Sequence, residues 1–321
     1  MFVLDIALGS VTIPISEIFS GIFSEEKSNY AVIINEFRFP KALTAVFTGV
    51  ALSLSGLLMQ TYFRNALAGP FVLGISSGAS LGVAIFVMAG SFIGFSIAAL
   101  TSSLSIVVAA IIGSVLVLML IVLFSTKLID SVSLLIIGVM VAAFSSSIVA
   151  VIQFFTSAEL LQSFIFWTMG SLSSVRGVAL LIYFIIILIG VLSSLLLIKP
   201  LNAFLIGESE ARTLGVNTNS FKWQIIFITA LLSGVATAFC GPIAFIGIAI
   251  PHLARRMFNA YTHEKLIGYT IFSGVIFMLM SDIISQLPGS EKVIPINAVT
   301  SLLGAPVVIW VVLKSKKARS F

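Results

Sequence analysis

The sequence predicts an all-α, polytopic helical membrane protein. Of its 321 residues, 59% are hydrophobic and 9% are charged, whereas a soluble domain carries about 25% charged residues. Apolar runs near 20 residues recur along the chain, and this is the length with which an α-helix crosses a bilayer. The alternating ten-residue pattern of membrane β-strands is absent. Because only helices and closed barrels satisfy the backbone in lipid, the apolar runs are interpreted as membrane-spanning helices.

The first 35 residues contain no complete span. The stretch MFVLDIALGSVTIPISEIF is interrupted by Asp5, Pro14 and Glu17, and no basic segment precedes an apolar one as in a signal peptide. Nine candidate spans follow, near residues 42–62, 71–92, 95–125, 131–155, 177–198, 223–240, 242–257, 267–285 and 298–313.

Two segments stand apart from the clear spans. The candidate at 242–257 is short and contains Pro251, so it is the weakest of the nine. The stretch near 157–172 is polar but compatible with a helix, and it is expected to lie at a membrane interface with Trp167 as its anchor.

Lysine and arginine set the expected orientation. If the loop at 203–216 is cytoplasmic and the spans alternate, twelve basic residues fall inside and five outside, which is the bias of a cytoplasmic assignment. The N-terminus would then begin outside without a span to carry it there. The sequence therefore favours a first helix that is missing from this chain, or else an unusual insertion.

The segment NAFLIGESEARTLG, residues 203–216, is charged and lies between two spans. Glu208, Glu210 and Arg212 alternate with small or apolar residues, and Gly215 stands where a short helix would need a left-handed stop. A soluble partner could bind a short helix held between two spans and, by pushing on it, move the spans. An ordinary solvated loop with one helical turn is the alternative.

A short internal similarity suggests inverted repeats. The octapeptides Gly49–Gly56 and Gly234–Gly241 share Gly-Val-Ala and a final glycine, and their spans run in opposite directions under the charge assignment. Transporters often use this plan. Chance similarity between small residues at close helix contacts explains the match equally well.

The sequence lacks the usual motifs of an enzyme or a metal site. No zinc-protease, P-loop or nucleophile-elbow motif is found, so no catalytic residue, metal ligand or cofactor is expected. Cys240 lies in an apolar run and is interpreted as a packing residue, and His252 and His263 make a weak ligand pair. Asp130 and Asp282 stand near span ends, where an interfacial position is the simplest explanation. With no buried carboxylate for ion exchange, a partner ATPase is the natural energy source.

Four segments resemble a known family. They are residues 37–82, which begin FRFPKALTAVF, the GESEARTLG stretch at 207–215, GPIAFIGIAIPHLARR at 241–256 and IPINAVTSLLGAPVVIWVVL at 294–313. Together they are similar to the permease subunits of ABC importers for iron–siderophore, haem and cobalamin. The resemblance covers essentially the whole chain.

This resemblance implies a type II ABC importer permease with ten helices, of which this chain would hold nine in a single domain spanning 1–321. Residues 1–36 would form an outer segment after the missing first helix. A homodimer, or a paired sister subunit, would enclose the translocation path in a bacterial inner membrane. Residues 203–216 would dock on a cytoplasmic ATP-binding subunit as a helix in a groove. The coupling residues implied are Gly207, Glu208, Ala211, Arg212, Leu214 and Gly215.

The resemblance also implies contacts outside and along the path. An extracytoplasmic substrate-binding protein would dock on Arg38, Lys41 or Lys292, while Gln286 replaces a basic residue of the family. Lys41 keeps a charge but lacks the planar fork of arginine, and snorkelling at the interface is the alternative role. Ser131 and Val132 map to the cytoplasmic gate. Ser145, Ser146 and Ser147 would line the path, unless they bond back to their own helix.

The predicted function is therefore that of a permease subunit, not an enzyme, in an ATP-driven importer for a ferric siderophore or similar iron chelate. Cobalamin or haem import is the first alternative, and an ion-coupled secondary carrier acting through Asp282 is the second. A membrane enzyme such as a lipid transferase would need a clustered acidic or histidine site. Lipid is expected around the chain, and the net charge of +5 reflects cytoplasmic loops rather than nucleic-acid binding.

Overall fold

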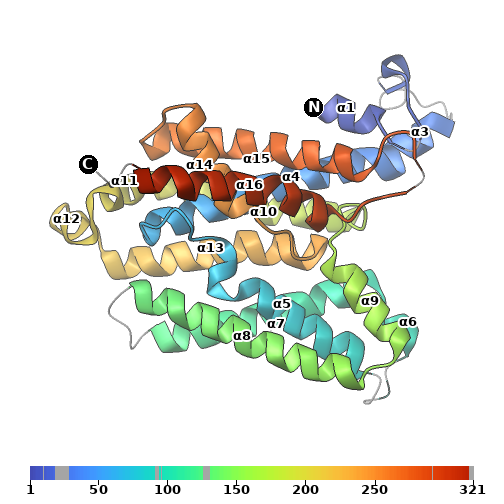
Figure 1. Cartoon of the computed structure of the whole chain (residues 1–321), viewed down its shortest axis with the longest axis horizontal. Helices are drawn as coiled ribbons and strands as arrows, with labels where there is room; N and C mark the ends of the chain where they lie inside the picture. Colours follow the sequence, from blue (N-terminus) through green and yellow to red (C-terminus); the bar gives the residue numbers. More distant parts are fainter. Residues whose placement is uncertain are drawn as a thin grey trace.

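The chain folds into a bundle of long helices, shown in Figure 1 by a computed structural model. The structure describes residues 1–9, 11–18, 29–90, 94, 96–125, 131–290 and 292–317. Within these ranges every regular element is a helix. The named elements are α1 Phe2–Ala7, α3 Asn29–Ile33, η1 Ile34–Arg38, α4 Phe39–Tyr62, η2 Pro70–Leu73, α5 Ile75–Ala84, η3 Ile85–Ala89, α6 Ile97–Leu100, α7 Ser103–Ser125, α8 Ser131–Phe155, α9 Ala158–Thr168, α10 Val178–Leu196, α11 Ile198–Ile206, α12 Glu208–Thr213, α13 Thr218–Cys240, α14 Ile246–Met257, α15 His263–Ser285 and α16 Ile296–Lys317.

Each of the nine expected spans contains a helix. In the described part of the chain, six helices are long and apolar enough to cross a membrane, and they belong to α4, α7, α8, α10, α13 and α15. Two further apolar helices, Ile75–Ala89 and Ile296–Trp310, are shorter. The ninth, α14, has only 12 residues, as expected for the weakest candidate. The protein is thus a multi-pass helical membrane protein.

The boundaries of three spans differ from the sequence prediction. The first span begins at Tyr30, because α3 and the π-helix η1 run directly into α4. The second begins as a 3-10 turn, and Gly74 at φ +66° resets the backbone before α5. The third is divided into α6 and α7, where the Ser102 hydroxyl accepts a hydrogen bond from Ser105 N (3.3 Å). Such local turn chemistry is invisible to a hydropathy pattern.

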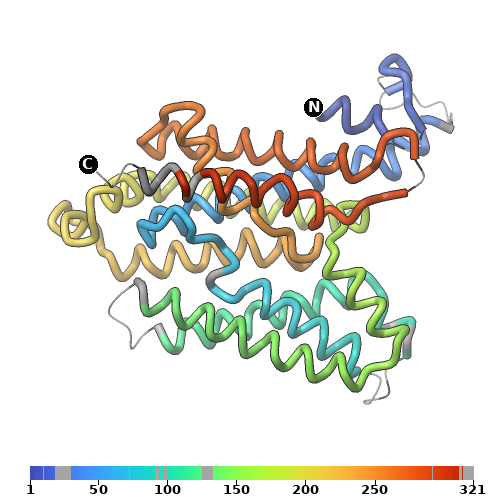
Figure 2. Tube along the Cα trace, in the orientation of Figure 1, coloured from blue at the N-terminus to red at the C-terminus, as the bar shows by residue number. Residues whose placement is uncertain are grey.

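The helix α4 is the centre of the bundle. It packs against α15, α13, α14 and α10, so segments from both halves of the sequence surround it. A second group consists of α5, α7 and α8, and α13 joins the groups by touching α4, α5 and α7. In Figure 2 the tube shows these groups as an upper blue, orange and red layer and a lower cyan and green one.

Glycines allow the central helices to touch backbone to backbone. A Cβ on Gly49 would lie 2.5 Å from the carbonyl oxygen of Gly274 in α15, and one on Gly56 would overlap the backbone of Gly247 in α14. Small residues at close helix contacts are typical of membrane proteins. The similar octapeptide in α13 ends differently, because its last residue, Gly241, lies beyond the helix at φ +77°.

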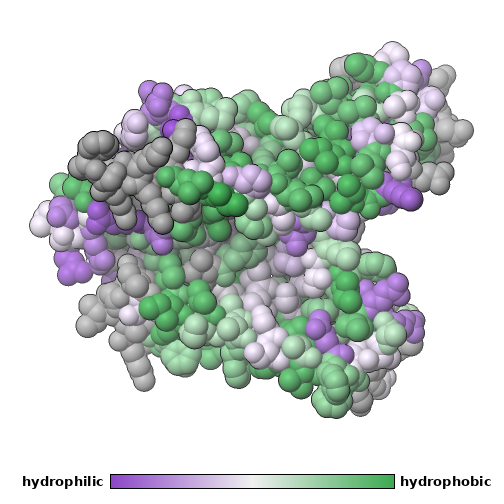
Figure 3. Space-filling view, viewed as in Figure 1, coloured by the Kyte–Doolittle hydropathy of each residue, from purple (hydrophilic) through white to green (hydrophobic). Residues whose placement is uncertain are grey.

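The two ends of the bundle differ in content. One end, here called the α12 end, carries α12, and the opposite end, the α1 end, carries α1, α6 and α9 (Figure 1). The Arg176 guanidinium stacks over the ring of Phe37 at 4.3 Å, so Arg176 lies at the same end of the bundle as Arg38, the α1 end. The charge pattern of the sequence assigns both arginines to the outer side. On the face shown in Figure 3, hydrophilic residues gather mainly toward these ends and apolar residues cover much of the middle.

Candidate functional site

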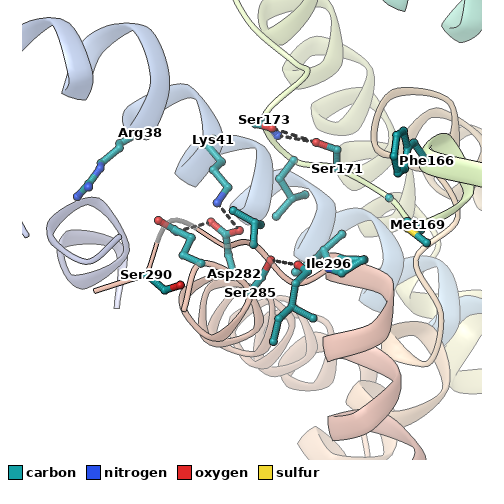
Figure 4. Close-up of a pocket in the computed structure, with 16 residues that line it drawn as sticks. Arg38, Lys41, Phe166, Met169, Ser171, Ser173, Asp282, Ser285, Ser290 and Ile296 are labelled. Carbon is teal, nitrogen blue, oxygen red and sulfur yellow. Dashed lines mark hydrogen bonds and ion pairs between the residues drawn. The ribbon is translucent and has the colours of Figure 1, made fainter. Parts of the chain in front are cut away.

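A pocket of about 480 Å³ opens at the α1 end of the bundle. It lies between the beginning of α4, the end of α15 and the segments that follow α9 and α15. Figure 4 shows Lys41 and Asp282 facing each other at its wall, with Ser171 and Ser173 across from them. Four of the polar residues lining it are Lys41, Asp282, Ser285 and Gln286.

An ion pair joins α4 to α15 at this pocket. Lys41 Nζ lies 2.9 Å from Asp282 Oδ1, and the Asp282 side chain is 1% exposed. Asp282 lies near the end of α15, as expected, and its carboxylate is buried in protein against α4. Burial is tolerated because the lysine ammonium neutralises it and Gln286 Nε2 donates a hydrogen bond to its Oδ2 (3.1 Å).

A second buried carboxylate, Asp5, shares this network. Gln286 Nε2 also donates to Asp5 Oδ1 (3.1 Å), so one amide bridges α1 and α15. Burial, and then the neighbouring Asp282 carboxylate, raise the pKa of Asp5 from 3.8 to about 8, against the opposing effects of Lys41 and Arg38. In the sequence Asp5 stands out only as an interruption, although a lone acidic residue in an apolar stretch is a signal for a buried polar contact.

Arg38 also lines the pocket, but its side chain extends toward α1 rather than toward Lys41 and Asp282 (Figure 4). Its guanidinium donates hydrogen bonds to the carbonyl oxygens of Ile6 (2.6 Å), Ala7 (3.0 Å) and Val11. The Ile6 and Ala7 carbonyls belong to the last turn of α1, which has no intrahelical partners and carries partial negative charge. Arg38 therefore holds the N-terminal segment on the bundle.

The residues expected to receive a binding protein thus have different surroundings. Arg38, Lys41 and Gln286 make internal contacts at the α1 end. Lys292 is exposed, and among the described residues its amine has no ion-pair partner. The structure gathers all four near the same end, but it leaves Lys292 as the freest cation of the set, so docking stays a prediction.

At the other end, the charged segment forms the short helix α12 that the sequence predicts. Gly215 adopts φ +87°, Val216 N donates to Ala211 O (3.0 Å) and Gly215 N donates to Arg212 O (3.1 Å). These two bonds and the left-handed glycine define a Schellman stop. Residues 203–206 belong instead to α11, from which Gly207 separates α12.

The coupling residues expected on α12 divide between two faces. Glu208 and Arg212 are exposed and 3.7 Å apart, and Leu214 is 65% exposed. Ala211 is fully buried in the hydrophobic core and Gly207 is also buried. The expected partner contact at Ala211 is therefore not available in this structure, because the periodicity of the helix turns that residue inward.

A groove of about 610 Å³ lies beside α12. Leu214, Gly215 and Val216 form one wall, and residues of α11 and α13, among them Asn202 and Phe221, form the others. The exposed face of α12 and this groove make a continuous surface at the α12 end. Its mixture of charged, amide and apolar groups suits a protein segment better than a small apolar ligand.

The expected gate and path residues lie on α8. Ser131 and Val132 are in its first turn, and their side chains lie outside the described part of the structure. Ser145 is buried, whereas Ser146 and Ser147 are exposed, so the three serines do not share one face. Ser147 Oγ donates to Ala143 O (3.0 Å), which is the back-bonded alternative left open for it.

Nothing in the described residues assembles a metal site. No group of three His, Cys, Asp or Glu side chains is found there. Instead both ring nitrogens of His263 make hydrogen-bonding contacts, with Asn202 and Thr61. The sequence does not reveal these partners of His263, because they come from two other helices, α11 and α4.

Comparison with known proteins gives one consistent result. A model of the FecCD transport family matches residues 1–314. An iron chelatin transport system permease protein of Helicobacter pylori is 33% identical, over 92% of this chain and 86% of the relative. The hemin transport system permease protein HmuU of Yersinia pestis is 34% identical, over 88% and 84% of the two chains. The solved structure of an inward-facing metal-chelate type ABC transporter matches with a TM-score of 0.84 and 30% identity, over 98% of this chain and 95% of that one.

Proposed function

The chain belongs to the FecCD transport family, and from that premise we propose that it carries a ferric siderophore or a similar iron chelate across a bacterial inner membrane. It is a permease subunit of an ABC importer and not itself an enzyme. Proteins of this kind work with ATP-binding subunits and a substrate-binding protein. The iron-chelate assignment is supported by the relative from Helicobacter pylori, whose name refers to that cargo.

The observation that carries the proposal is the exposed face of α12. The side chains of Glu208, Arg212 and Leu214 are exposed at a short helix, and the buried Ala211 anchors this helix in the core. A partner can therefore bind a surface that is held in place. The ATP-binding subunit would dock on this face and on the neighbouring groove. Closure of the two ATP-binding subunits would displace α12 and drive alternating access as a rigid-body motion.

The second permease copy would lie against α8. In this chain only 17% of the membrane-length window in Ser133–Phe155 is buried, and its exposed side chains include Phe144 and Ser146. A path between two such faces would be lined by small and apolar groups that bind cargo weakly. Weak binding favours release, while the binding protein would select the cargo.

Two alternatives are distinguished by cargo and by energy source. Cobalamin or haem could follow the same path, because the exposed α8 side chains that would line it, such as Phe144 and Ser146, are uncharged and not specific for one bulky cargo. An ion-coupled carrier would need a carboxylate that gains and loses a cation. Asp282 is buried and paired with Lys41 at 2.9 Å, and a permanently paired carboxylate is poorly suited to that exchange.

Uptake into proteoliposomes tests the proposal. The chain would be reconstituted with its ATP-binding subunit and binding protein, with ATP inside, and offered radiolabelled ferric siderophore, haem or cobalamin in parallel. We expect ATP-dependent accumulation of the ferric siderophore. Accumulation of cobalamin or haem instead would reassign the cargo, and uptake driven by a proton gradient without ATP would contradict the importer.

A matched pair of charge reversals tests the docking face. Glu208→Lys, on exposed α12, should reduce both co-purification of the ATP-binding subunit and uptake, because it places like charge beside Arg212 and alters the docking face. Glu159→Lys reverses an exposed glutamate of α9 at the opposite end and should leave co-purification unchanged. Equal retention of the ATP-binding subunit by both variants would contradict docking on α12.

A further inference from the structure

A hydrogen-bond network at the α12 end joins three helices. The Asn202 Oδ1 of α11 lies 2.8 Å from the backbone N of His263 and 2.9 Å from its ring Nδ1. Asn202 Nδ2 donates to Glu264 Oε1 (2.9 Å). The other ring nitrogen, Nε2, lies 2.9 Å from Thr61 Oγ1 of α4. His263 is fully buried and begins α15, so this single side chain joins α11, α4 and α15.

The donor of each bond follows from the chemistry of the partners. An amide oxygen only accepts, so His263 Nδ1 carries a hydrogen and donates it to Asn202 Oδ1. In the neutral ring Nε2 is then an acceptor, and the Thr61 hydroxyl donates to it. Leu57 O, 3.0 Å from the same hydroxyl, offers the alternative acceptor within α4. Each hydrogen bond of the network thus has a defined donor. Because Asn202 Oδ1 orients the imidazole ring, a substitution of Asn202 changes the position of Nε2 relative to the Thr61 hydroxyl.

The helices α4 and α15 are antiparallel neighbours joined at both ends. The α12 end has the hydrogen bond just described, and the α1 end has the ion pair between Lys41 and Asp282. Midway, Gly49 and Gly274 bring the two backbones into direct contact. The end contacts are 20 residues apart along α4 and 19 along α15, which is about 30 Å at 1.5 Å per residue. Contacts at both ends and between them resist movement of one helix relative to the other.

Asn202 lies between the proposed docking surface and the α4–α15 pair, so a partner that displaced α12 would also displace Asn202. It lines the groove beside α12, opposite Leu214, and its helix α11 leads through Gly207 into α12. The far end of the α4–α15 pair forms the wall of the pocket at the α1 end. A continuous series of packed and hydrogen-bonded elements therefore runs from the proposed ATPase-docking surface to the opposite end of the bundle.

We propose that His263 is a positioning residue that transmits the displacement of α11 and α12 to the α4–α15 pair, and through it to the pocket at the α1 end. This inference rests on the proposed function, because it assigns a route to the same ATP-driven motion. Loss of the network leaves the docking face and the ATP-binding subunit intact. It weakens the connection of α11 to α4, which then rests on packing such as the ring contact between Tyr62 and Phe204 (centroids 6.0 Å apart), so ATP is hydrolysed with less transport.

The chain supplies closely matched variants of one helix. Thr61→Val removes the hydroxyl that meets His263 and keeps the side-chain shape, whereas Thr61→Ser keeps the hydroxyl. Thr48→Val is the control, since Thr48 Oγ1 also bonds back to its own helix, at Thr44 O (2.7 Å), and across to Tyr183 Oη of α10 (2.8 Å). Both threonines are buried in α4, but within the described part of the chain the hydrogen-bonding contacts of Thr48 reach α10 and, through Cys240 Sγ (3.4 Å), α13, and none reaches α11 or α15. Asn202→Ala breaks the network from its half-buried end.

The measurement is the number of ferric siderophore molecules accumulated per ATP hydrolysed in proteoliposomes, with the melting temperature of each complex. Thr61→Val and Asn202→Ala should lower this ratio about fivefold, the effect of one buried hydrogen bond on an equilibrium, while ATP hydrolysis continues. Thr61→Ser should restore the ratio. Thr48→Val should lose as much thermal stability as Thr61→Val and keep the ratio.

Two results would overturn the inference while the proposed function stands. One is that uptake and hydrolysis fall together in Thr61→Val, which is the behaviour of a merely structural contact. The other is that Thr48→Val lowers the ratio as much as Thr61→Val. If the unaltered complex shows no ATP-driven uptake of any of the three cargoes, the proposed function fails, and the transmission route fails with it.

Discussion

At the scale of single residues, the α1 end depends on a few buried polar contacts. Lys41 and Asp282 form an ion pair, and Gln286 links Asp282 to Asp5. Removing one member of a buried pair is costly because it leaves the other charge without compensation, whereas replacing both is often tolerated. Removing Lys41 alone should therefore cost more stability than replacing Lys41 and Asp282 together.

We expect Lys41→Met to destabilise the protein by about 3–5 kcal/mol, because Asp282 then stays buried without its cationic partner. The double variant Lys41→Met with Asp282→Leu should recover much of this loss. Thermal unfolding of the detergent-solubilised protein measures both. The control is Lys265→Met, which removes an exposed lysine, and equal melting temperatures for the two single variants would contradict a structural ion pair.

The raised pKa of Asp5 gives a pH dependence of defined sign. Folded Asp5 keeps its proton up to about pH 8, whereas the unfolded carboxyl loses it near 3.8, so folding takes up a proton between these values. This contribution to stability is present in full at low pH and is lost as pH rises toward 8, by up to about 1.4 kcal/mol per unit. Between pH 5 and 9 the melting temperature should fall more steeply for the unaltered protein than for Asp5→Asn. Parallel curves would show that Asp5 ionises normally.

At the scale of helices, the bundle is organised by the closeness of α4 to its neighbours. Gly56 touches the backbone of Gly247, and Gly49 touches that of Gly274. Backbone contact of this kind replaces the hydrophobic effect, which does not drive helices together within lipid. It also leaves no room for a side chain.

Gly56→Ala should therefore destabilise the bundle by about 1–3 kcal/mol or more, because α14 must move away from α4 to admit the methyl group. Gly268→Ala in α15 is the matched control, since nothing lies within 4 Å of its added Cβ. Alanine favours a helix over glycine by up to about 1 kcal/mol, so the control should melt at the same temperature or higher. Thermal unfolding measures both, and similar losses would show that the α4–α14 contact is looser than described.

At the scale of the whole molecule, the charged helix α12 lies at one end and a polar pocket at the other. The docking face of α12 and the pocket beside Lys41 are joined by the α4–α15 pair. Apolar side chains of α7, α8 and α10 remain exposed between them, among them Leu104, Phe144 and Leu196. Such surfaces suit lipid and a second permease copy, and an importer needs both.

Much of this organisation could be predicted from the sequence. The fold class, the nine helical segments and the left-handed stop at Gly215 follow from hydrophobic length and local turn chemistry, and the structure confirms them. The break between α6 and α7 was not predicted, because the polar stretch TSSLS at 101–105 is too short to interrupt a span that is recognised by its hydrophobic length. The inward face of Ala211 could not be assigned either, since six residues are too few to define an amphipathic pattern.

Contiguous residues carry the hydrophobic runs and the family motifs, so a helical membrane protein of the permease class can be identified from them without a structure. The roles of the polar residues emerge only when the chain is folded. Asp282 pairs with Lys41 of another helix, and His263, 202 positions from Thr61, joins three helices. The physical reason is that burying a polar group is favourable only with a partner, and packing of distant segments decides which partner comes within hydrogen-bond distance.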